Sequence, residues 1–282
     1  MNLTALGKKS LLPFAVFLAF FPILNPLGIF TDLRTTSFDT FQTLFPRPVL
    51  EDDPVVIIDI DDESLNRIGQ WPWPRDTLAS LTDQTQLAAV TGFDIVFAEP
   101  DRTGSKQLQE IYAEDNDLVK KLESIMDHDE LFAKAINNHG TVVLGLAPNN
   151  KNSTQSTKDK FGLVTQGDDP KLFIQAYNGL QRNLPLLESA SSGLGSMSIG
   201  NDDSIVRKLP SFENIDGNLV PSLSLELVRV AIGASTYQIK SSNASSEKAF
   251  GENTGINNIK LGSLVTVSYT HLRAHETSPH LV

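Results

Sequence analysis

The chain has 282 residues, 40% of them hydrophobic and 20% charged, so it is long enough for one large globular domain or two small ones. Its formal net charge of −11 and its pI near 4.9 argue against a general nucleic-acid binder, because such proteins are normally basic. The absence of cysteine excludes disulfides, thiolate metal sites and cysteine nucleophiles.

The first predicted element is a membrane anchor. Lys8 and Lys9 precede the uncharged stretch Leu11–Phe30, which is about as long as a helix that spans a bilayer core. The two lysines favour a cytoplasmic N-terminus, with Asp32 onward outside the membrane. A cleaved signal peptide is the alternative, but the apolar run is long for one and no small-x-small cleavage site follows. We therefore expect residues 1–30 to form a cytoplasmic N-terminus and a transmembrane helix.

An amphipathic helix is predicted directly after the anchor. Its apolar residues recur at three- and four-residue spacings: Phe38, Phe41, Leu44 and Phe45. The next element, "PVVIIDI" from Pro54 to Ile60, is a short apolar run rich in β-branched residues, which predicts a buried strand. Asp62 is a plausible N-cap for a helix that Gly69 would end.

Alternating strands and helices are predicted over the next 80 residues or so. After the turn "WPWPRD", Asp76 is expected to cap a helix over Thr77–Ala89, and Gly92–Ala98 reads as a second strand with Asp94 inside it. Helices are predicted over Gln107–Tyr112 and Asn116–Asn137. "TVVLGLA", Thr141–Ala147, is the third strand, and the alternation indicates an α/β layer with parallel strands.

The rest of the chain alternates polar loops with short elements. Polar loops are expected over Pro148–Pro170 and Ala234–Asn257. "LPLLESASSGLGSMSIG" predicts a short helix, a glycine turn and a strand. A hairpin around Asp216–Gly217, a helix from Ser222 and a last strand over Asn258–Val265 complete the pattern. The predicted fold class is α/β, with a mixed, largely parallel sheet flanked by helices and preceded by one N-terminal transmembrane helix.

The C-terminal tail is expected to be foreign to the protein. "VSYTHLRAHET", from Val267, is similar to a translated sequencing adapter, so residues 267–282 are interpreted as a non-native tail. The four-residue spacing of His271 and His275 would otherwise suit a metal on a helix. Without the tail, only His128 and His139 remain of the histidines, and both are expected to be solvated. The natural chain is expected to continue past Thr266.

Four motifs in order carry a family resemblance: "VVIIDIDDESLNRIGQWPWPRD", "GFDIVFAEPD", "GLGSMSIGNDDSIVRKLP" and "GNLVPSLSLELVR". Together they resemble the second subfamily of CHASE domains, the extracellular sensory domains of cyclases and histidine kinases. The resemblance implies an anchored, extracytoplasmic sensor over residues 31–266, truncated at its C-terminal end. It also implies a missing cytoplasmic output domain, either an adenylate or guanylate cyclase or a histidine or serine/threonine kinase.

The carboxylates after the first predicted strand leave three interpretations open. Asp59 and Asp61 have the spacing of haloacid-dehalogenase-like hydrolases and could hold Mg²⁺ as an exported phosphatase, although Glu63 departs from that pattern. A structural role is the second interpretation, with Asp62 capping a helix and Asp59 or Asp61 pairing with Arg75.

Ligand sensing is the third interpretation, because pockets form beyond the carboxyl ends of parallel strands. The pocket would suit a cation, an amine or a hydroxylated ligand. The candidate ligand-binding residues are Asp59, Asp61, Asp62, Trp71, Trp73, Arg75, Asp94, Glu99 and Asp101. Arg207 and Lys208 are expected to be exposed hairpin charges.

The sequence as a whole predicts a non-enzymatic input domain of a membrane receptor. We expect the sensor to lie outside a bacterial inner membrane, to form a homodimer and to bind a small extracellular ligand. We expect no catalytic residue, metal, cofactor or nucleic-acid partner. A secreted binding protein with a cleaved signal is the further alternative.

Overall fold

The computed structural model describes residues 29–46, 54–151, 160–199, 206, 209–244 and 255–267. The chain divides into two compact units, Met1–Asp62 and Glu63–Val282. The predicted anchor, the charges Arg207 and Lys208, and the tail histidines fall outside the described residues, apart from Ile29 and Phe30 at the end of the anchor.

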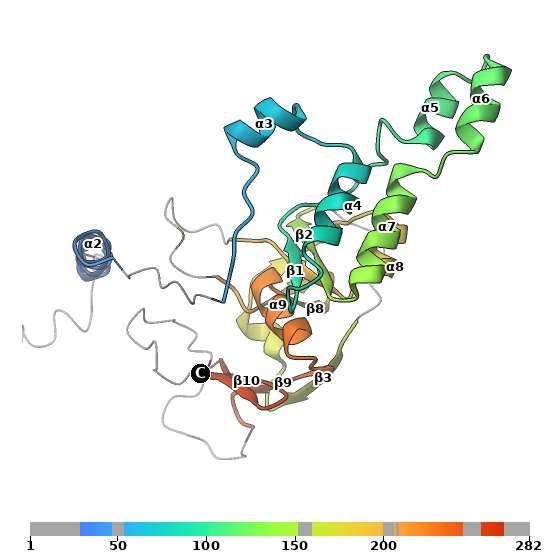
Figure 1. Ribbon diagram of the computed structural model, residues 1–282. Coiled ribbons are helices and arrows are strands. Elements are labelled where there is room, and N and C mark those ends of the chain that lie inside the picture. Colours follow the sequence, from blue (N-terminus) through green and yellow to red (C-terminus); the bar gives the residue numbers. More distant parts are fainter. Residues whose placement is uncertain are drawn as a thin grey trace, which may run out of the picture. The chain divides into compact units, whose positions relative to one another are not determined.

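The first unit contains the helix α2, Ile29–Leu44 (Figure 1). It confirms the amphipathic helix predicted after the anchor and begins a few residues earlier than expected. The rings of Phe41 and Phe45 stack with their centroids 6.4 Å apart, and both side chains are largely exposed. Among the described residues, no helix combines the length and the apolar character needed to cross a membrane.

The strand predicted over Pro54–Ile60 is wrong. These residues are extended but form no strand, and the exposed fractions of Val55, Val56 and Ile57 are 74, 84 and 85%. A β-branched run becomes a strand only where a neighbouring strand pairs with its backbone, and these residues have no such pairing. The helix that follows, α3, begins at Asp62 and ends at Ile68, before Gly69 with its φ of +118°.

The second unit contains a sheet with a parallel core. The strand β2, Val142–Asn149, lies between β1, Thr91–Phe93, and β6, Gly193–Ser196, and is parallel to both. In this register one residue from each strand forms a row: Phe93, Leu144 and Leu194. The short β5, Gly179–Gln181, adds an antiparallel edge to β2. The predicted parallel pairing is therefore confirmed for the second and third predicted strands, and β6 joins them in the same orientation.

Helices α4, Arg75–Gln84, and α7, His128–His139, lie side by side near this sheet (Figure 1). Phe132 of α7 meets Phe93 and Phe97 edge to face, with centroids 5.5 and 5.1 Å away. The aromatic contacts fix α7 against the strand β1 and the segment that follows it.

Two helix predictions in this region need correction. Asp76 does not cap its helix, because α4 already begins at Arg75 with Pro74 before it. The single helix predicted over Asn116–Asn137 is broken into α6, Asn116–Glu123, and α7. The break has a local cause: the Asp127 side chain accepts the Asp129 N–H, at 3.1 Å, and so starts a new helix. The α5 helix, Ser105–Ile111, packs against α6.

The second half of the unit adds a three-stranded sheet. The strands β7, Phe212–Ile215, and β8, Asn218–Pro221, form the predicted hairpin, and β4, Ala176–Tyr177, pairs with β7 in parallel. Asp216 and Gly217 have φ of 49° and 79°, which a tight hairpin turn requires. The helices α8, Pro185–Ala190, and α9, Leu223–Ala231, confirm the two helices predicted here.

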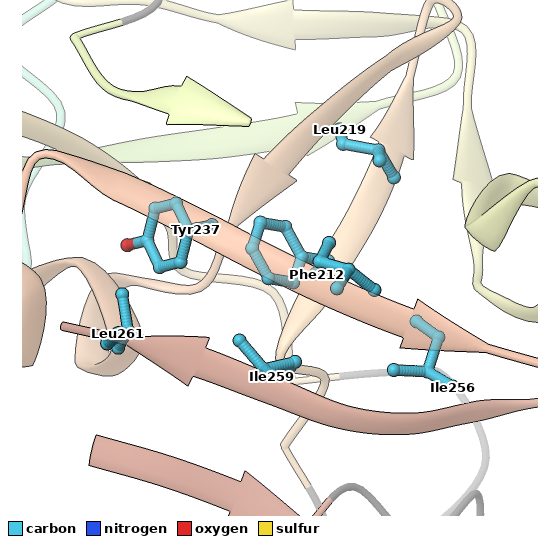
Figure 2. Close-up of a cluster of buried hydrophobic side chains, with 7 residues drawn as sticks. Phe212, Leu219, Tyr237, Ile256, Ile259 and Leu261 are labelled. Atoms are coloured by element: carbon cyan, nitrogen blue, oxygen red, sulfur yellow. The ribbon is translucent and has the colours of Figure 1, made fainter. Parts of the chain in front are cut away.

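A third sheet lies partly in predicted polar loops and partly in the predicted last strand, Asn258–Val265, which turns at Gly262 and forms two antiparallel strands. Its order is β11-β10-β9-β3, with bounds Leu264–Val267, Ile256–Leu261, Thr236–Ser241 and Gly162–Gln166. The 3-10 turn η1, Pro170–Phe173, follows β3. One face of this sheet packs against the hairpin through Phe212 and Tyr237, whose ring centroids are 5.1 Å apart (Figure 2). The part of the chain that the structure describes is thus α/β as predicted, but with three mixed sheets in place of one.

Candidate functional site

A buried cluster of charged side chains lies at the N-terminal ends of α4 and α7. Arg75 opens α4, Asp129 lies in the first turn of α7, and Asp101 comes from the segment between β1 and α5. Their exposed fractions are only 8, 5 and 6%. Burial of charge is costly without partners, so the contacts of each group decide what the cluster can do.

Arg75 is held loosely for a buried guanidinium. Its Nε lies 3.6 Å from Oδ1 of Asp129, and its Nη2 donates to the backbone carbonyl of Glu99 at 3.4 Å. The guanidinium carbon also lies 4.6 Å from the centroid of the Phe97 ring, a cation–π contact. Burial lowers the pKa of Arg75, and the Asp129 and Asp101 carboxylates oppose that change.

Asp101 is the best-bonded member of the cluster. Its Oδ2 accepts the backbone N–H of Arg75 at 2.6 Å, and its Oδ1 accepts both the N–H and the hydroxyl of Thr103, each at 2.8 Å. Nδ1 of His128 lies 3.1 Å from Oδ2. Burial alone would raise the pKa of Asp101, but these hydrogen bonds together lower it below the ordinary aspartate value.

For Asp129, burial outweighs the hydrogen bonds in setting the pKa. Its Oδ2 accepts the Asp101 N–H at 3.0 Å, whereas its Oδ1 is buried and has no hydrogen-bond partner, like the Nε of Arg75 that faces it. Burial raises the pKa of Asp129, and the hydrogen bond from Asp101 and the charge of Arg75 do not offset it. The cluster therefore contains one carboxylate that holds its charge easily and one that does not.

Comparison with known proteins assigns the chain to a family. The sequence model of the CHASE2 domain matches residues 14–279, nearly the whole chain. The chain belongs to the CHASE2 family. CHASE2 domains are extracellular sensory domains, and the match is consistent with a sensing input domain. No curated protein and no solved structure matches the chain significantly.

The candidate ligand residues of this CHASE2 domain fall into two groups. Asp59, Asp61 and Asp62 are exposed and belong to the first unit, so their convergence with Glu99 and Asp101 stays a prediction. The other candidates belong to the second unit, where Arg75 and Asp101 lie in one cluster.

The tryptophans lie just before that cluster. Trp71 and Trp73 meet edge to face at 5.8 Å, and Nε1 of Trp73 donates to the Gly69 carbonyl at 2.7 Å. The Trp73 side chain is buried and contributes to the packing of the second unit. The Glu99 side chain and Asp94 are exposed, and Asp94 follows β1 instead of lying inside a strand as predicted.

Two acidic residues at the start of α7 were not among the predicted site residues: Asp127 and Asp129. Their signal is "MDHDE", a run of acidic residues that suits a helix N-terminus, but it was hidden inside one long predicted helix. The prediction that His128 and His139 are solvated is wrong. His128 contacts Asp101, and Nε2 of His139 lies 2.9 Å from the backbone carbonyl of Thr85.

A second buried network joins α9 to the third sheet. Arg229 binds Glu226 through Nε at 2.8 Å and Nη2 at 2.7 Å, and the hydroxyl of Tyr237 in β9 donates to Glu226 at 2.6 Å. The remaining donors of Arg229 reach the carbonyls of Ala234 and Ser192, at 2.8 and 3.0 Å. Burial raises the pKa of Tyr237, and the charge of Glu226 raises it further.

Glu213 is an isolated buried carboxylate in β7. Ser196 donates a hydrogen bond to its Oε2, while Oε1 has no partner, and burial raises its pKa. The neighbouring Asn214 also has an unpartnered oxygen, but successive strand residues point to opposite faces, so the two do not make one site. Among the described residues, no three histidine, aspartate or glutamate side chains come together as a metal site.

Proposed function

We propose that this CHASE2 domain is the extracytoplasmic input domain of a bacterial membrane receptor. The observation that carries the proposal is the family match over residues 14–279. The uncharged stretch Leu11–Phe30 after Lys8 and Lys9 supports an anchor in the inner membrane, with the second unit outside. In this proposal a missing cytoplasmic cyclase or kinase domain supplies the enzymatic activity.

Signal transmission is proposed to start from a small extracellular ligand. A ligand can change the conformation of the sensor only by binding one of its conformations better than another. The cluster of Arg75, Asp101 and Asp129 supports a ligand site in the second unit. Two of its buried polar atoms, Nε of Arg75 and Oδ1 of Asp129, have no hydrogen-bond partner. Asp59, Asp61 and Asp62 remain proposed members of the acidic ligand-binding rim.

The receptor is proposed to act as a homodimer. The apolar side chains of α2 support this, because three of them are more than 60% exposed: Leu33, Phe41 and Leu44. Exposed apolar stripes of this kind commonly mark contacts with another chain or with lipid. Chemical cross-linking of the membrane-embedded chain would show a dimer band, whereas a monomer at all concentrations would contradict this part of the proposal.

Topology and the continuation of the gene test the proposal as a whole. Alkaline phosphatase fused after Lys151 should be active and green fluorescent protein fused at the same place dark, because only the former matures outside the cytoplasm. The gene downstream of Thr266 should encode further membrane helices and a cyclase or kinase domain. Reversed reporter signals, or a gene that encodes neither membrane helices nor a cyclase or kinase domain, would contradict the proposal that the chain belongs to a receptor.

A further inference from the structure

Two buried polar atoms of the second unit face each other without a hydrogen bond. Nε of Arg75, at the start of α4, lies 3.6 Å from Oδ1 of Asp129, in the first turn of α7. That distance is too long for a hydrogen bond, and neither atom has a hydrogen-bond partner within the part of the chain that the structure describes. Both residues are more than nine-tenths buried. The pair therefore presents one unused donor and one unused acceptor side by side.

The polar groups around this pair already have partners. Asp101 accepts the Arg75 N–H through Oδ2, and it accepts the N–H and the hydroxyl of Thr103 through Oδ1. Oδ2 of Asp129 accepts the Asp101 N–H, and Nη2 of Arg75 donates to the Glu99 carbonyl. The hydrogen bonds that a ligand can newly form inside the cluster are therefore those to Nε of Arg75 and Oδ1 of Asp129.

The pair favours a ligand group that donates and accepts through the same atom. An ammonium group only donates, so it leaves Nε of Arg75 unbonded and adds a positive charge beside the guanidinium. A carboxylate only accepts, so it leaves Oδ1 of Asp129 unbonded and meets the like charges of Asp129 and Asp101. A hydroxyl accepts the Nε hydrogen and donates its own hydrogen to Oδ1, and it brings no charge into the buried cluster.

Insertion of a hydroxyl requires the starts of the two helices to move apart. An oxygen that bonds both atoms with ordinary lengths and an ordinary angle holds them about 4.5 Å apart, whereas they now lie 3.6 Å apart. Helices α4 and α7 lie side by side and carry one atom each (Figure 1). Binding therefore favours one arrangement of these helices over another, which is the condition for a ligand to act on a sensor.

The groups next to the pair are polar and partly exposed. The side chains of His128 and Asp76 are 21 and 48% exposed, and Thr103 is exposed. Nε2 of His128 lies 3.9 Å from Oδ2 of Asp76, which is beyond hydrogen-bond distance. A ligand with several hydroxyls can bond to these groups as well as to the buried pair. An apolar ligand would leave all of them unbonded.

We propose that the cluster of Arg75, Asp101 and Asp129 binds a neutral polyol or sugar, and that one hydroxyl of this ligand bridges Nε of Arg75 and Oδ1 of Asp129. The role of this ligand as a signal rests on the proposed receptor function. The binding itself is a property of the second unit. Of the ligand classes that the sequence left open, the structure thus favours the hydroxylated one over a cation or an amine.

Saturation-transfer NMR on the full chain in nanodiscs tests the chemistry of the ligand. The probes are glycerol, propylammonium and propionate, which are similar in size and present hydroxyl, ammonium and carboxylate groups. We expect glycerol to bind saturably with a Kd of about 1–10 mM, as is ordinary for so small a ligand, and the other two to bind at least about tenfold more weakly. A response to glycerol that does not saturate, or tighter binding of either charged probe, would overturn the proposal.

Three variants locate the site. D129E keeps the charge and lengthens the side chain, so its carboxylate can reach Nε of Arg75 directly, and we expect glycerol binding to be lost. D129N keeps the size but weakens the acceptor, so we expect the Kd to rise about tenfold. K106A is the matched control, because it removes an exposed ion pair near the start of α7 and should leave the Kd unchanged. Wild-type affinity in D129E, or equal losses in all three variants, would refute the proposal.

Two further comparisons keep the outcomes distinct. Circular dichroism shows whether the variants fold, and if the Asp129 variants do not, the order of the three probes on the wild-type chain still decides. The reporter fusions after Lys151 separate this site from the receptor. Expected reporter signals together with tighter binding of propylammonium would overturn the hydroxyl site alone. Reversed reporter signals together with glycerol binding that D129E abolishes would support the hydroxyl site and contradict only the receptor.

Discussion

Two buried ionic networks in the second unit hold neighbouring elements together in different ways. In the Glu226–Arg229–Tyr237 network, every nitrogen of the guanidinium donates a hydrogen bond and the carboxylate is bound at both oxygens. In the cluster around Arg75, one guanidinium nitrogen and one carboxylate oxygen face each other without bonding. Burial alone therefore does not make a charge pair rigid. The first network holds its side chains in one arrangement, whereas the second contains polar groups that are free to form new hydrogen bonds.

The largest expected effect comes from breaking the fully bonded network. E226Q leaves the charge of Arg229 buried without its carboxylate, and we expect a loss of about 3–5 kcal/mol in the free energy of unfolding. Urea unfolding followed by far-ultraviolet circular dichroism measures it. A loss below about 1 kcal/mol would show that this network is no tighter than an exposed pair.

A smaller effect is expected at the edge of the same network. Y237F removes the hydroxyl that donates to Glu226 at 2.6 Å, so we expect a loss of about 1.5–3 kcal/mol, as for hydrogen bonds to charged groups. The ring and its packing against Phe212 remain, so the same unfolding assay isolates the hydroxyl. No measurable change would mean that Glu226 is satisfied by Arg229 alone.

The loosely bonded cluster should respond less and in a pH-dependent way. D129N removes a carboxylate whose pKa is raised by burial, and we expect it to cost only about 1 kcal/mol at pH 7.5. The wild-type aspartate gains stability as the pH falls through its raised folded pKa, because protonation relieves its buried charge. The cost of D129N should therefore grow between pH 7.5 and pH 4. A cost that shrinks over this range would reverse the assignment of Asp129 as the strained carboxylate.

The smallest effect is expected for the exposed ion pair of Lys106 and Glu130. Their side chains are 66 and 46% exposed, so K106A should change the free energy of unfolding by less than about 0.5 kcal/mol. This variant is the baseline for the other three. A loss as large as that of D129N would mean that the difference between the networks does not come from burial.

The sequence predicted what local patterns determine. The strands β2 and β6, the hairpin at Asp216–Gly217 and the helix from Ser222 each have a short-range signal, and the structure confirms them. The predicted strand Gly92–Ala98 is confirmed only in its first residues, as β1. The break at Asp127 was missed because the apolar periodicity continues across it, while the cap that interrupts it is a single side chain. The strand β9 was missed although it alternates: Tyr237, Ile239 and Ser241 are buried and the residues between them are exposed, but the polar residues around this short run hid the pattern.

The candidate site was predictable only in part. Arg75 and Asp101 were named because they follow a turn and a strand, and they do lie together. Their partner Asp129 lies 28 residues further along the chain from Asp101, and no local pattern reports a contact of that separation. The run Val55–Ile58 shows the converse error, since apolar β-branched residues predict a strand but cannot supply the neighbour that completes it.

The contact between Trp71 and Trp73 has a practical consequence. The chain contains only these two tryptophans, and their indole rings meet at 68° with centroids 5.8 Å apart, within four residues of Arg75. Two indoles this close couple their electronic transitions, so the pair should give a distinctive circular dichroism band that vanishes when either ring is replaced. The molecule thus has its own optical probe at the start of α4, and movements there can be followed without attaching a dye.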